Sequence, residues 1–184
     1  MSSSKDLVRS ELLAIRYRRG DAEAMGELVL IWQNPLYYYV RRLVPDDEEA
    51  LDVVQDVWVL VIRRFRQLRN PAAFPAWLFK IARSVAYGRV RRSQPQEMVT
   101  ANDLASQEEG EEDSDPLAQF TAERVHHGLT RVSVAHRDCL TLHFIEGFSL
   151  AEVSQIVGIP VGTVKSRLHY AKKALRCVLE EESS

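Results

Sequence analysis

The chain has 184 residues, 46% of them hydrophobic, and a formal net charge of −2, which is normal for a soluble globular protein of one or two small domains. Its two cysteines, Cys139 and Cys177, are too few for a disulfide framework and favour a reducing compartment. The N-terminus MSSSKD has no signal-peptide apolar run, and no stretch approaches the roughly 18 apolar residues of a membrane helix, so we expect a cytoplasmic protein without membrane insertion.

The first 45 residues are expected to be helical. An amphipathic pattern over residues 5–19 ends at Gly20, and Asp21 can cap a second helix. Pro35 marks a kink in that helix or the start of another. The three tyrosines at 37–39 point in different directions on a helix, which favours packing roles over base stacking.

A long helix is predicted over residues 48–68, because the acidic run at 46–49 suits a helix N-terminus. Its apolar residues form a stripe that we expect to face the core: Leu51, Val54, Val57, Trp58, Val61, Ile62 and Phe65. Asp52, Gln55 and Asp56 remain on more exposed faces and have no obvious duty inside a monomer. Carboxylates and an amide on one helix suit a basic partner helix.

Asn70 and Pro71 form a cap and first-turn pair, and Pro75 opens a further helix that extends to residue 92. Basic and aromatic side chains are interleaved along it: Phe79, Lys80, Arg83, Tyr87, Arg89, Arg91 and Arg92. This pattern suits single-stranded nucleic acid, whose bases stack on the rings while its backbone meets the cations. The alternative is a solvated basic face with buried aromatic residues.

Residues 93–115 are poor in aromatic side chains and rich in Glu, Asp, Ser and Gln, which is typical of a disordered linker. Residues 96–123 hold nine acidic side chains and no basic one, whereas residues 1–95 have a net charge of +5. Fully extended, residues 93–115 could bridge about 75 Å at roughly 3.3 Å per residue. We therefore predict an all-α protein with two small helical domains, 1–95 and 116–184, joined by a flexible acidic linker at 96–115.

The stretch 149–175 predicts a helix-turn-helix. Ser149 and Glu152 can form a capping box at the start of its first helix. Gly158 allows the left-handed backbone that ends this helix, and Pro160 restarts the chain. The second helix presents a basic, hydrogen-bonding side that suits a major groove: Thr163, Lys165, Ser166, Arg167, His169, Tyr170, Lys172 and Lys173. An ordinary helical hairpin with a solvated charged face is the alternative.

A metal site is a competing hypothesis for the preceding helix. His136, Cys139 and His143 share one helical face, and residues 126–127 could supply a fourth ligand. Because the two histidines flank an apolar run, packing is the favoured interpretation, and we expect no metal and no cofactor. No Gly-rich phosphate loop or nucleophile–base arrangement occurs in the sequence, so we expect a protein that is not an enzyme.

Three motifs, in order, resemble those of extracytoplasmic-function (ECF) sigma factors, which belong to the sigma-70 family of bacterial RNA polymerase subunits. DVVQDVWV at 52–59 is similar to the signature that binds the polymerase clamp. FPAWLFKIARSVAYGRVRR at 74–92 resembles the helix that melts and reads the −10 promoter element. Residues 136–175 resemble the −35-reading domain, most closely at PVGTVKSRL.

The resemblance implies a role for each of three sets of residues. It implies that four residues bind the clamp of the β′ subunit of core polymerase: Asp52, Gln55, Asp56 and Trp58. It also implies that the protein contacts the β subunit. It assigns melted −10 DNA to Asn70, Phe74, Trp77, Lys80, Arg83, Ser84, Tyr87, Arg91 and Arg92. It assigns duplex −35 DNA to Thr163, Lys165, Ser166, Arg167, His169, Tyr170, Lys172 and Lys173.

The implied function is promoter-specific initiation of transcription, with core RNA polymerase, promoter DNA and an anti-sigma factor as partners. A helix-turn-helix regulator that does not associate with core polymerase is the alternative, and a sequestering decoy without promoter binding is another. A simple regulator does not need the DVVQDVW helix, and a decoy would not keep the basic faces.

Overall fold

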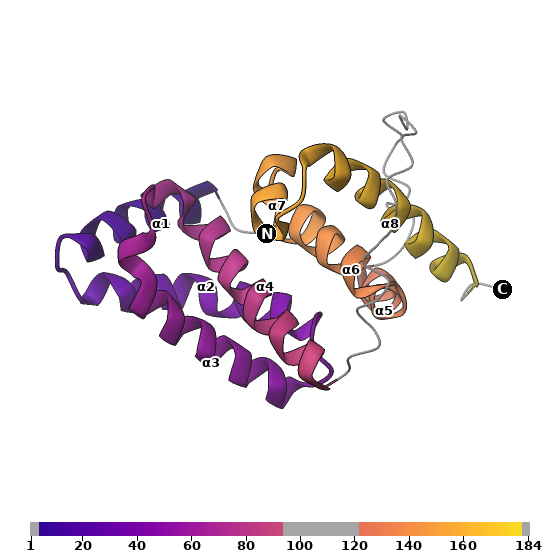
Figure 1. The fold of residues 1–184 in the computed structure, drawn as a ribbon, viewed down its shortest axis with the longest axis horizontal. Helices are drawn as coiled ribbons and strands as arrows, with labels where there is room; N and C mark the ends of the chain where they lie inside the picture. Colours follow the sequence, from indigo (N-terminus) through magenta and orange to yellow (C-terminus); the bar gives the residue numbers. More distant parts are fainter. Residues whose placement is uncertain (1–3, 94–121, 182–184) are drawn as a thin grey trace.

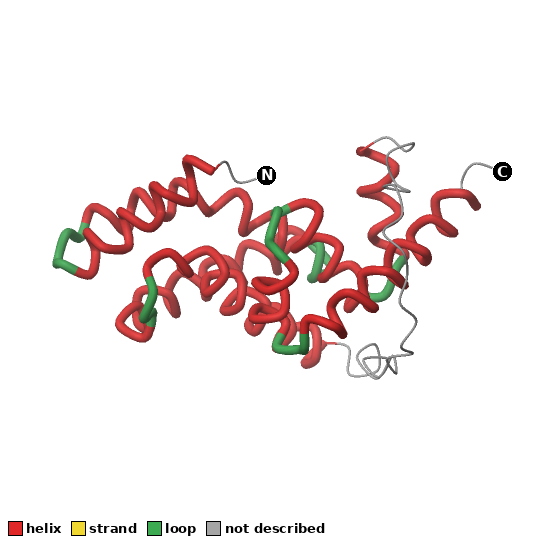
Figure 2. The backbone as a smooth tube through the Cα atoms, turned by 90° about the horizontal axis from the view of Figure 1, so that it is seen from above, coloured by secondary structure: helices red, strands yellow, loops and turns green. Residues whose placement is uncertain are grey.

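The computed structural model describes residues 4–93 and 122–181, and within these ranges all regular elements are helices, as predicted (Figures 1 and 2). They are α1 (Ser4–Arg18), α2 (Glu23–Arg41), α3 (Asp47–Arg64), α4 (Phe74–Ser93), α5 (Ala122–Arg131), α6 (Val134–Leu140), α7 (Leu150–Val157) and α8 (Val161–Glu181). Short 3₁₀ turns at Phe65–Gln67 and Pro71–Ala73 connect α3 to α4, and a π-helical turn at Thr141–Ile145 follows α6. The predicted linker at 96–115 lies outside the described residues.

Helices α1 to α4, indigo to magenta in Figure 1, share one core. Leu13, Leu28, Trp32 and Phe79 are buried in it, and the Trp32 and Phe79 rings meet edge to face at 6.1 Å. The Trp32 indole N–H donates to the Ser10 hydroxyl at 2.7 Å. Because an indole N–H buried without an acceptor costs free energy, this bond favours one register of α1 on α2.

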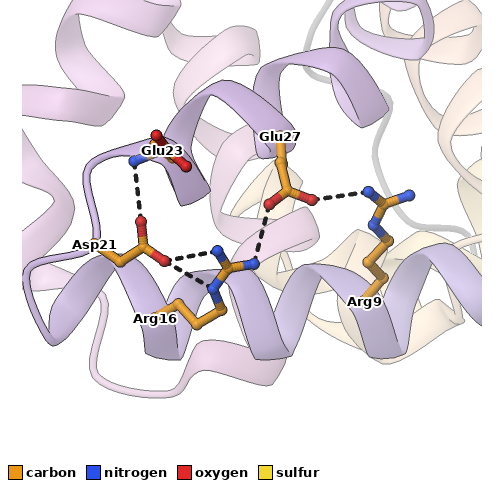
Figure 3. Close-up of polar contacts among 5 residues, drawn as sticks. All are labelled: Arg9, Arg16, Asp21, Glu23 and Glu27. Atoms are coloured by element: carbon orange, nitrogen blue, oxygen red, sulfur yellow. Dashed lines mark hydrogen bonds and ion pairs between the residues drawn. The ribbon is translucent and has the colours of Figure 1, made fainter.

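Exposed ion pairs hold the turn between α1 and α2 (Figure 3). Arg16 donates to Asp21 at 2.8 Å and to Glu27 at 3.0 Å, and Arg9 binds the other oxygen of Glu27. Asp21 also accepts the backbone N–H of Glu23, so it stabilises the helix start that the sequence predicted for it. Hydrogen bonds from the guanidinium groups lower the pKa of Asp21 and the pKa of Glu27.

Helix α2 continues through Pro35, which excludes the start of a new helix there and leaves a kink as the remaining alternative. The predicted stripe of α3 is confirmed in part, because Val57, Val61 and Phe65 are buried and Val54 and Trp58 pack partly buried against the core, next to the buried Ala50 and Val53. Leu51 and Ile62 instead face outward, because valine and leucine occur on nearly every side of this helix and the periodicity leaves its packed side undetermined.

The helix-turn-helix forms as predicted in α7 and α8. The Ser149 hydroxyl accepts the Glu152 N–H at 3.3 Å, and the Glu152 carboxylate accepts the Ser149 N–H at 2.9 Å, which completes the capping box. Gly158 ends α7 with φ of 80° and ψ of 31°, in the left-handed region that favours glycine. The inward side of α8 is buried as expected and consists of Val164, Leu168, Ala171 and Leu175.

The helices before and after the predicted linker pack against each other (Figure 1). Helix α4 contacts α7, and the Phe79 ring meets Phe148 edge to face at 5.0 Å. Arg137 of α6 donates to the carbonyl oxygen of Arg42, just after α2, at 2.8 Å. The first helix of the helix-turn-helix therefore lies against the helix that carries the interleaved basic and aromatic residues.

Candidate polymerase and DNA interfaces

The outward face of α3 carries Asp52, Gln55 and Asp56, and all three are exposed. Arg89 of α4 reaches both carboxylates, with 2.9 Å between its Nη2 and Asp56 and 3.7 Å between its Nη1 and Asp52. The expectation that these carboxylates have no duty inside the monomer is therefore wrong, because they join α3 to α4. Exposed ion pairs of this kind contribute at most about 1 kcal/mol, so cations of a partner protein can replace Arg89 at little cost.

Apolar side chains extend the same face along α3. Leu51, Val59 and Ile62 are 60%, 41% and 50% exposed. Together with Gln55 they follow one another at intervals of four, four and three residues, which aligns them on one side of the helix. Trp58 is half-buried and packs against the core instead. The outer face of α3 thus combines acidic, amide and apolar groups, which suits a protein partner better than solvent.

The loop before α4 forms one wall of a cavity of about 450 Å³. Asn70 shapes the loop, because its Oδ1 accepts the Ala72 N–H at 3.2 Å. Trp77 and Lys80 of α4 line the cavity as well, and Gln155 of α7 contributes from the helix-turn-helix. An aromatic ring, an amide and a cation around a cavity can hold a base that has left its stack.

Phe74 does not belong to this surface. It is fully buried, with its ring 6.1 Å from Phe65 and 6.3 Å from Trp77. The prediction that Phe74 binds −10 DNA is wrong for this structure, because no part of the ring reaches solvent. Phe79 is buried as well, so only Tyr87 of the two aromatic residues expected to interleave with cations reaches a surface.

A buried carboxylate of α6 engages two further residues of the predicted −10 set. Asp138 is 1% exposed, and its Oδ2 accepts from Arg83 Nε at 2.6 Å and from the Tyr87 hydroxyl at 3.0 Å. Its Oδ1 accepts from the Tyr39 hydroxyl of α2 at 2.8 Å. Burial raises the pKa of both tyrosines, so both hydroxyls are donors at neutral pH. Burial alone would lower the pKa of Arg83, but the Asp138 carboxylate outweighs it and the pKa rises.

The remaining predicted residues of α4 are open to solvent. Ser84, Arg91 and Arg92 are exposed. Ser84 also lines a second cavity, of about 270 Å³, together with Trp77 and Lys80. These side chains and the loop cavity are therefore accessible to a strand, whereas Arg83 and Tyr87 are engaged by Asp138.

The outer side of α8 carries most of the predicted −35 residues. Lys165, His169 and Lys173 are exposed, and the half-buried ones are Thr163, Ser166, Tyr170 and Lys172. The Ser166 hydroxyl donates to the Thr163 carbonyl oxygen at 3.1 Å, so its hydrogen is committed within the helix. The exposed cations and imidazole give α8 a hydrogen-bonding face toward solvent.

Arg167 differs from its neighbours on α8. It is half-buried and lies beside the thiol of Cys139 in α6. Burial raises the pKa of this thiol to about 11, and the Arg167 guanidinium counteracts the rise through its charge and a hydrogen bond. Arg167 therefore lies between α8 and α6 with part of its side chain open to solvent, and the −35 contact expected of it stays a prediction.

The metal hypothesis does not match the geometry. Across residues 4–93 and 122–181, no group of three or more His, Cys, Asp or Glu side chains is placed to hold a metal ion. His143 Nδ1 lies 2.8 Å from the Phe148 carbonyl oxygen, and Cys139 lies against Arg167. The side chain of residue 126 lies outside the described part of the chain.

Comparison with known proteins identifies the two groups of helices. A family model described as sigma-70 region 2 matches residues 28–96, and one described as sigma-70, region 4 matches residues 123–175. RNA polymerase sigma-H factor of Pseudomonas aeruginosa is 32% identical, over 94% of this chain and 94% of that protein. The chain belongs to the sigma-70 family. ECF RNA polymerase sigma-E factor of Escherichia coli is 30% identical, over 90% of this sigma factor and 91% of the relative.

The family membership establishes that this ECF sigma factor directs promoter-specific initiation by RNA polymerase. Two solved structures share its fold. CnrH in complex with the cytosolic domain of CnrY has a TM-score of 0.69 at 24% identity, covering 94% of this chain and 98% of that one. The sigma factor RpoE in complex with the anti-sigma factor NepR from Bartonella quintana has a TM-score of 0.65 at 22% identity, covering 84% and 96%. Among the helices of the described ranges, none has the length and hydropathy to cross a membrane.

Proposed function

We propose that this sigma factor divides its work among three helices. Helix α3 binds core polymerase, α4 and the loop before it bind the melted −10 strand, and α8 reads the −35 duplex. The observation that supports the proposal is where these surfaces lie in the chain: α3 and α4 fall within the region 2 match, and α8 falls within the region 4 match up to residue 175. We also propose domain limits of 1–95 and 116–184, with 96–115 as the connecting linker.

On α3, the polar groups orient the polymerase and the apolar groups contribute affinity. Asp52, Gln55 and Asp56 offer acceptors to a basic helix of the β′ clamp, which orients the partner, and β is a further contact of the bound sigma factor. Covering the exposed parts of Leu51 and Ile62 contributes about 1 kcal/mol or more for each side chain. The apolar groups therefore supply more of the affinity than the exposed ion pairs do.

On α4 and its loop, the proposed −10 site consists of Asn70, Trp77, Lys80, Arg83, Ser84, Tyr87, Arg91 and Arg92. The side of the cavity formed by Asn70, Trp77 and Lys80 takes an extruded base, and the cations follow the strand's phosphates. Extrusion costs a few kcal/mol of stacking, which contacts with the cavity must offset. Phe74 supports this site from the core.

On α8, the exposed side chains of Lys165 and His169 contact the −35 duplex in this proposal, together with the half-buried Thr163, Ser166 and Tyr170. Lys172 and Lys173 suit phosphate contacts, which position the helix without specifying sequence. Arg167, which is half-buried beside Cys139 of α6, belongs to the same proposed −35 set.

The sigma factor carries out no chemistry in this proposal, because the polymerase forms the phosphodiester bonds. It works in the cytoplasm, where polymerase and promoters are found. Both structural relatives were solved with a bound protein partner, which in the RpoE complex is the anti-sigma factor NepR. We therefore propose that an anti-sigma factor also binds this protein.

The direct test is in vitro transcription with bacterial core polymerase and this protein on a library of templates with randomised −10 and −35 positions. We expect initiation from a defined subset of templates that share two short motifs. Core polymerase alone provides the control for background starts. Initiation no more selective than that of core enzyme alone would contradict the proposed division of work.

A further inference from the structure

We propose that Asp138 is an internal competitor for promoter DNA. In the packed arrangement its carboxylate takes the place of a phosphate of the melted −10 strand at Arg83 and Tyr87. The proposal rests on the −10 role proposed for α4. It adds a state of the protein in which its own −35 half blocks its −10 half.

The chemistry of the cluster supports this substitution. A carboxylate and a phosphodiester each present two anionic oxygens to nearby donors, and guanidinium groups bind both. Arg83 donates to Asp138 at 2.6 Å and Tyr87 at 3.0 Å, and the Arg83 guanidinium also stacks 4.2 Å from the centre of the Tyr87 ring. Donors occupied in this way are not available to a strand.

The partners in the cluster come from different halves of the chain. Asp138 belongs to α6, after the predicted linker, whereas Tyr39, Arg83 and Tyr87 belong to α2 and α4, before it. The cluster therefore exists only while the two halves are packed together. When they separate, Asp138 loses all three donors, and the same event exposes Arg83 and Tyr87.

Other contacts close the same junction. Arg137, next to Asp138 in the sequence, donates to the Arg42 carbonyl oxygen, and Phe79 packs on Phe148. A cleft of about 370 Å³ between α4 and α7 is lined by Lys80, Arg83, Ser84 and Tyr87 on one side and by residues 156–158 on the other. The −10 face of α4 is thus partly covered by the helix-turn-helix that must read a different element.

Promoter geometry requires this junction to open. Positions −10 and −35 are 25 base pairs apart, which is about 85 Å at roughly 3.4 Å per pair. Contact between α4 and α7 cannot persist when each half sits on its own element. The 28 residues from 94 to 121 can span about 95 Å at most, so the chain is long enough for the open state.

The test uses the full chain with the substitution Asp138→Asn, which keeps the side chain's shape and removes its charge. Binding to fluorescein-labelled oligo(dT) of 12 nucleotides is measured by anisotropy at several salt concentrations, and the radius of gyration is measured by small-angle X-ray scattering. We expect about tenfold tighter binding, a larger radius, and a plot of log K against log salt that is steeper by about 0.7, the value for one additional phosphate contact with a single strand.

Asp21→Asn is the matched control, because it also removes one negative charge but lies at the turn between α1 and α2. It should change neither the radius nor the salt slope. Tyr39→Phe is the second variant, since it removes one bond to Asp138 from a side chain that is buried and outside the proposed DNA site. Tyr39→Phe should also tighten oligo(dT) binding and enlarge the radius of gyration, but by less than Asp138→Asn. If Asp138→Asn does not fold, the result for Tyr39→Phe tests the role of Asp138.

The outcomes separate the two proposals. An unchanged radius and unchanged oligo(dT) binding in the folded variants would overturn the role of Asp138. A larger radius without tighter binding would show that the junction opens but that Arg83 does not bind the strand, which would refute the −10 assignment instead. Adding Arg83→Ala to Asp138→Asn should remove the gain in affinity and return the salt slope to the wild-type value.

Discussion

Glu146 shows how the junction between the two halves of the chain affects a single side chain. It is 9% exposed, and burial raises the pKa of its carboxyl group to about 7, while the charge of Arg42 counteracts part of the rise. The packed state therefore holds a proton on Glu146 more tightly than the unfolded chain does. The resulting stability is fully present below the ordinary pKa of 4.5 and is lost as pH rises through about 7.

Glu146→Gln should remove this pH dependence, because the amide stays neutral. We expect the variant to gain stability over the wild type in urea-induced unfolding between pH 5 and pH 8, with the larger difference at pH 8. Unfolding curves at both pH values, followed by circular dichroism, measure the difference. A stability gap that is the same at pH 5 and pH 8 would show that Glu146 does not titrate in this range.

Two glycines with different backbone conformations test the effect of adding a Cβ atom: Gly158 has a positive φ, and Gly26 is helical. Gly158 has φ of +80°, so Gly158→Ala should lower the free energy of unfolding by roughly 1–2 kcal/mol. Gly26 lies in the first turn of α2, where an added Cβ would have no atom within 4 Å apart from its neighbours in the helix, so Gly26→Ala should raise it by up to about 1 kcal/mol. Thermal unfolding of the two variants provides the measurement, and shifts of equal sign would contradict the assigned backbone conformations.

At the scale of elements, helix ends were easier to predict than helix orientation. Ser149, Glu152 and Gly158 stabilise the ends of α7 through bonds within a few residues, so the sequence alone locates them. The packed side of α3 depends on which of many apolar residues meets α2 and α4, and for that reason Leu51 was assigned to the wrong side. The partners of Asp138 lie 51 to 99 residues away in the sequence. The local sequence signal for this cluster is limited to Asp138 itself, an acidic residue next to buried apolar ones.

The polar part of the α3 face has a direct test. Changing Asp52, Gln55 and Asp56 together to alanine should reduce co-purification with core polymerase at least tenfold while helicity is unchanged. Arg89→Ala is the matched control, because it breaks the same internal ion pairs but leaves the carboxylates in place. If Arg89→Ala lowers polymerase binding as much as the triple variant does, the carboxylates act by holding α4 and not by meeting the polymerase.

The apolar part of the α3 face predicts a separate effect. Leu51→Ser with Ile62→Ser should change the free energy of unfolding by no more than about 0.5 kcal/mol per site, because both side chains are already exposed. Polymerase binding should nevertheless weaken roughly thirtyfold or more, since each side chain contributes about 1 kcal/mol or more. Leu30→Ser on α2, where the side chain is 72% exposed, is the control and should leave polymerase binding unchanged. Equal polymerase binding by the wild type, the double variant and the Leu30→Ser control would exclude Leu51 and Ile62 from the interface.

At the scale of the whole molecule, local sequence patterns predict the helices of each half. They do not predict how the two halves pack against each other. All-α architecture and the two groups of helices followed from periodicity, caps and the acidic stretch between them. The packing of α4 on α7 instead depends on pairs such as Phe79 with Phe148, which are 69 residues apart and carry no joint pattern. Such a junction can be recognised only when both halves are seen together.

The contact between Asp138 and Arg83 also has a consequence for dosage. Both groups belong to one chain, so the carboxylate competes at a fixed effective concentration that the length of the connecting segment determines. Raising or lowering the amount of sigma factor in the cell leaves this competition unchanged, because it is unimolecular. The fraction of molecules ready to take up a DNA strand is then determined by what binds the protein and not by how much of it has been made.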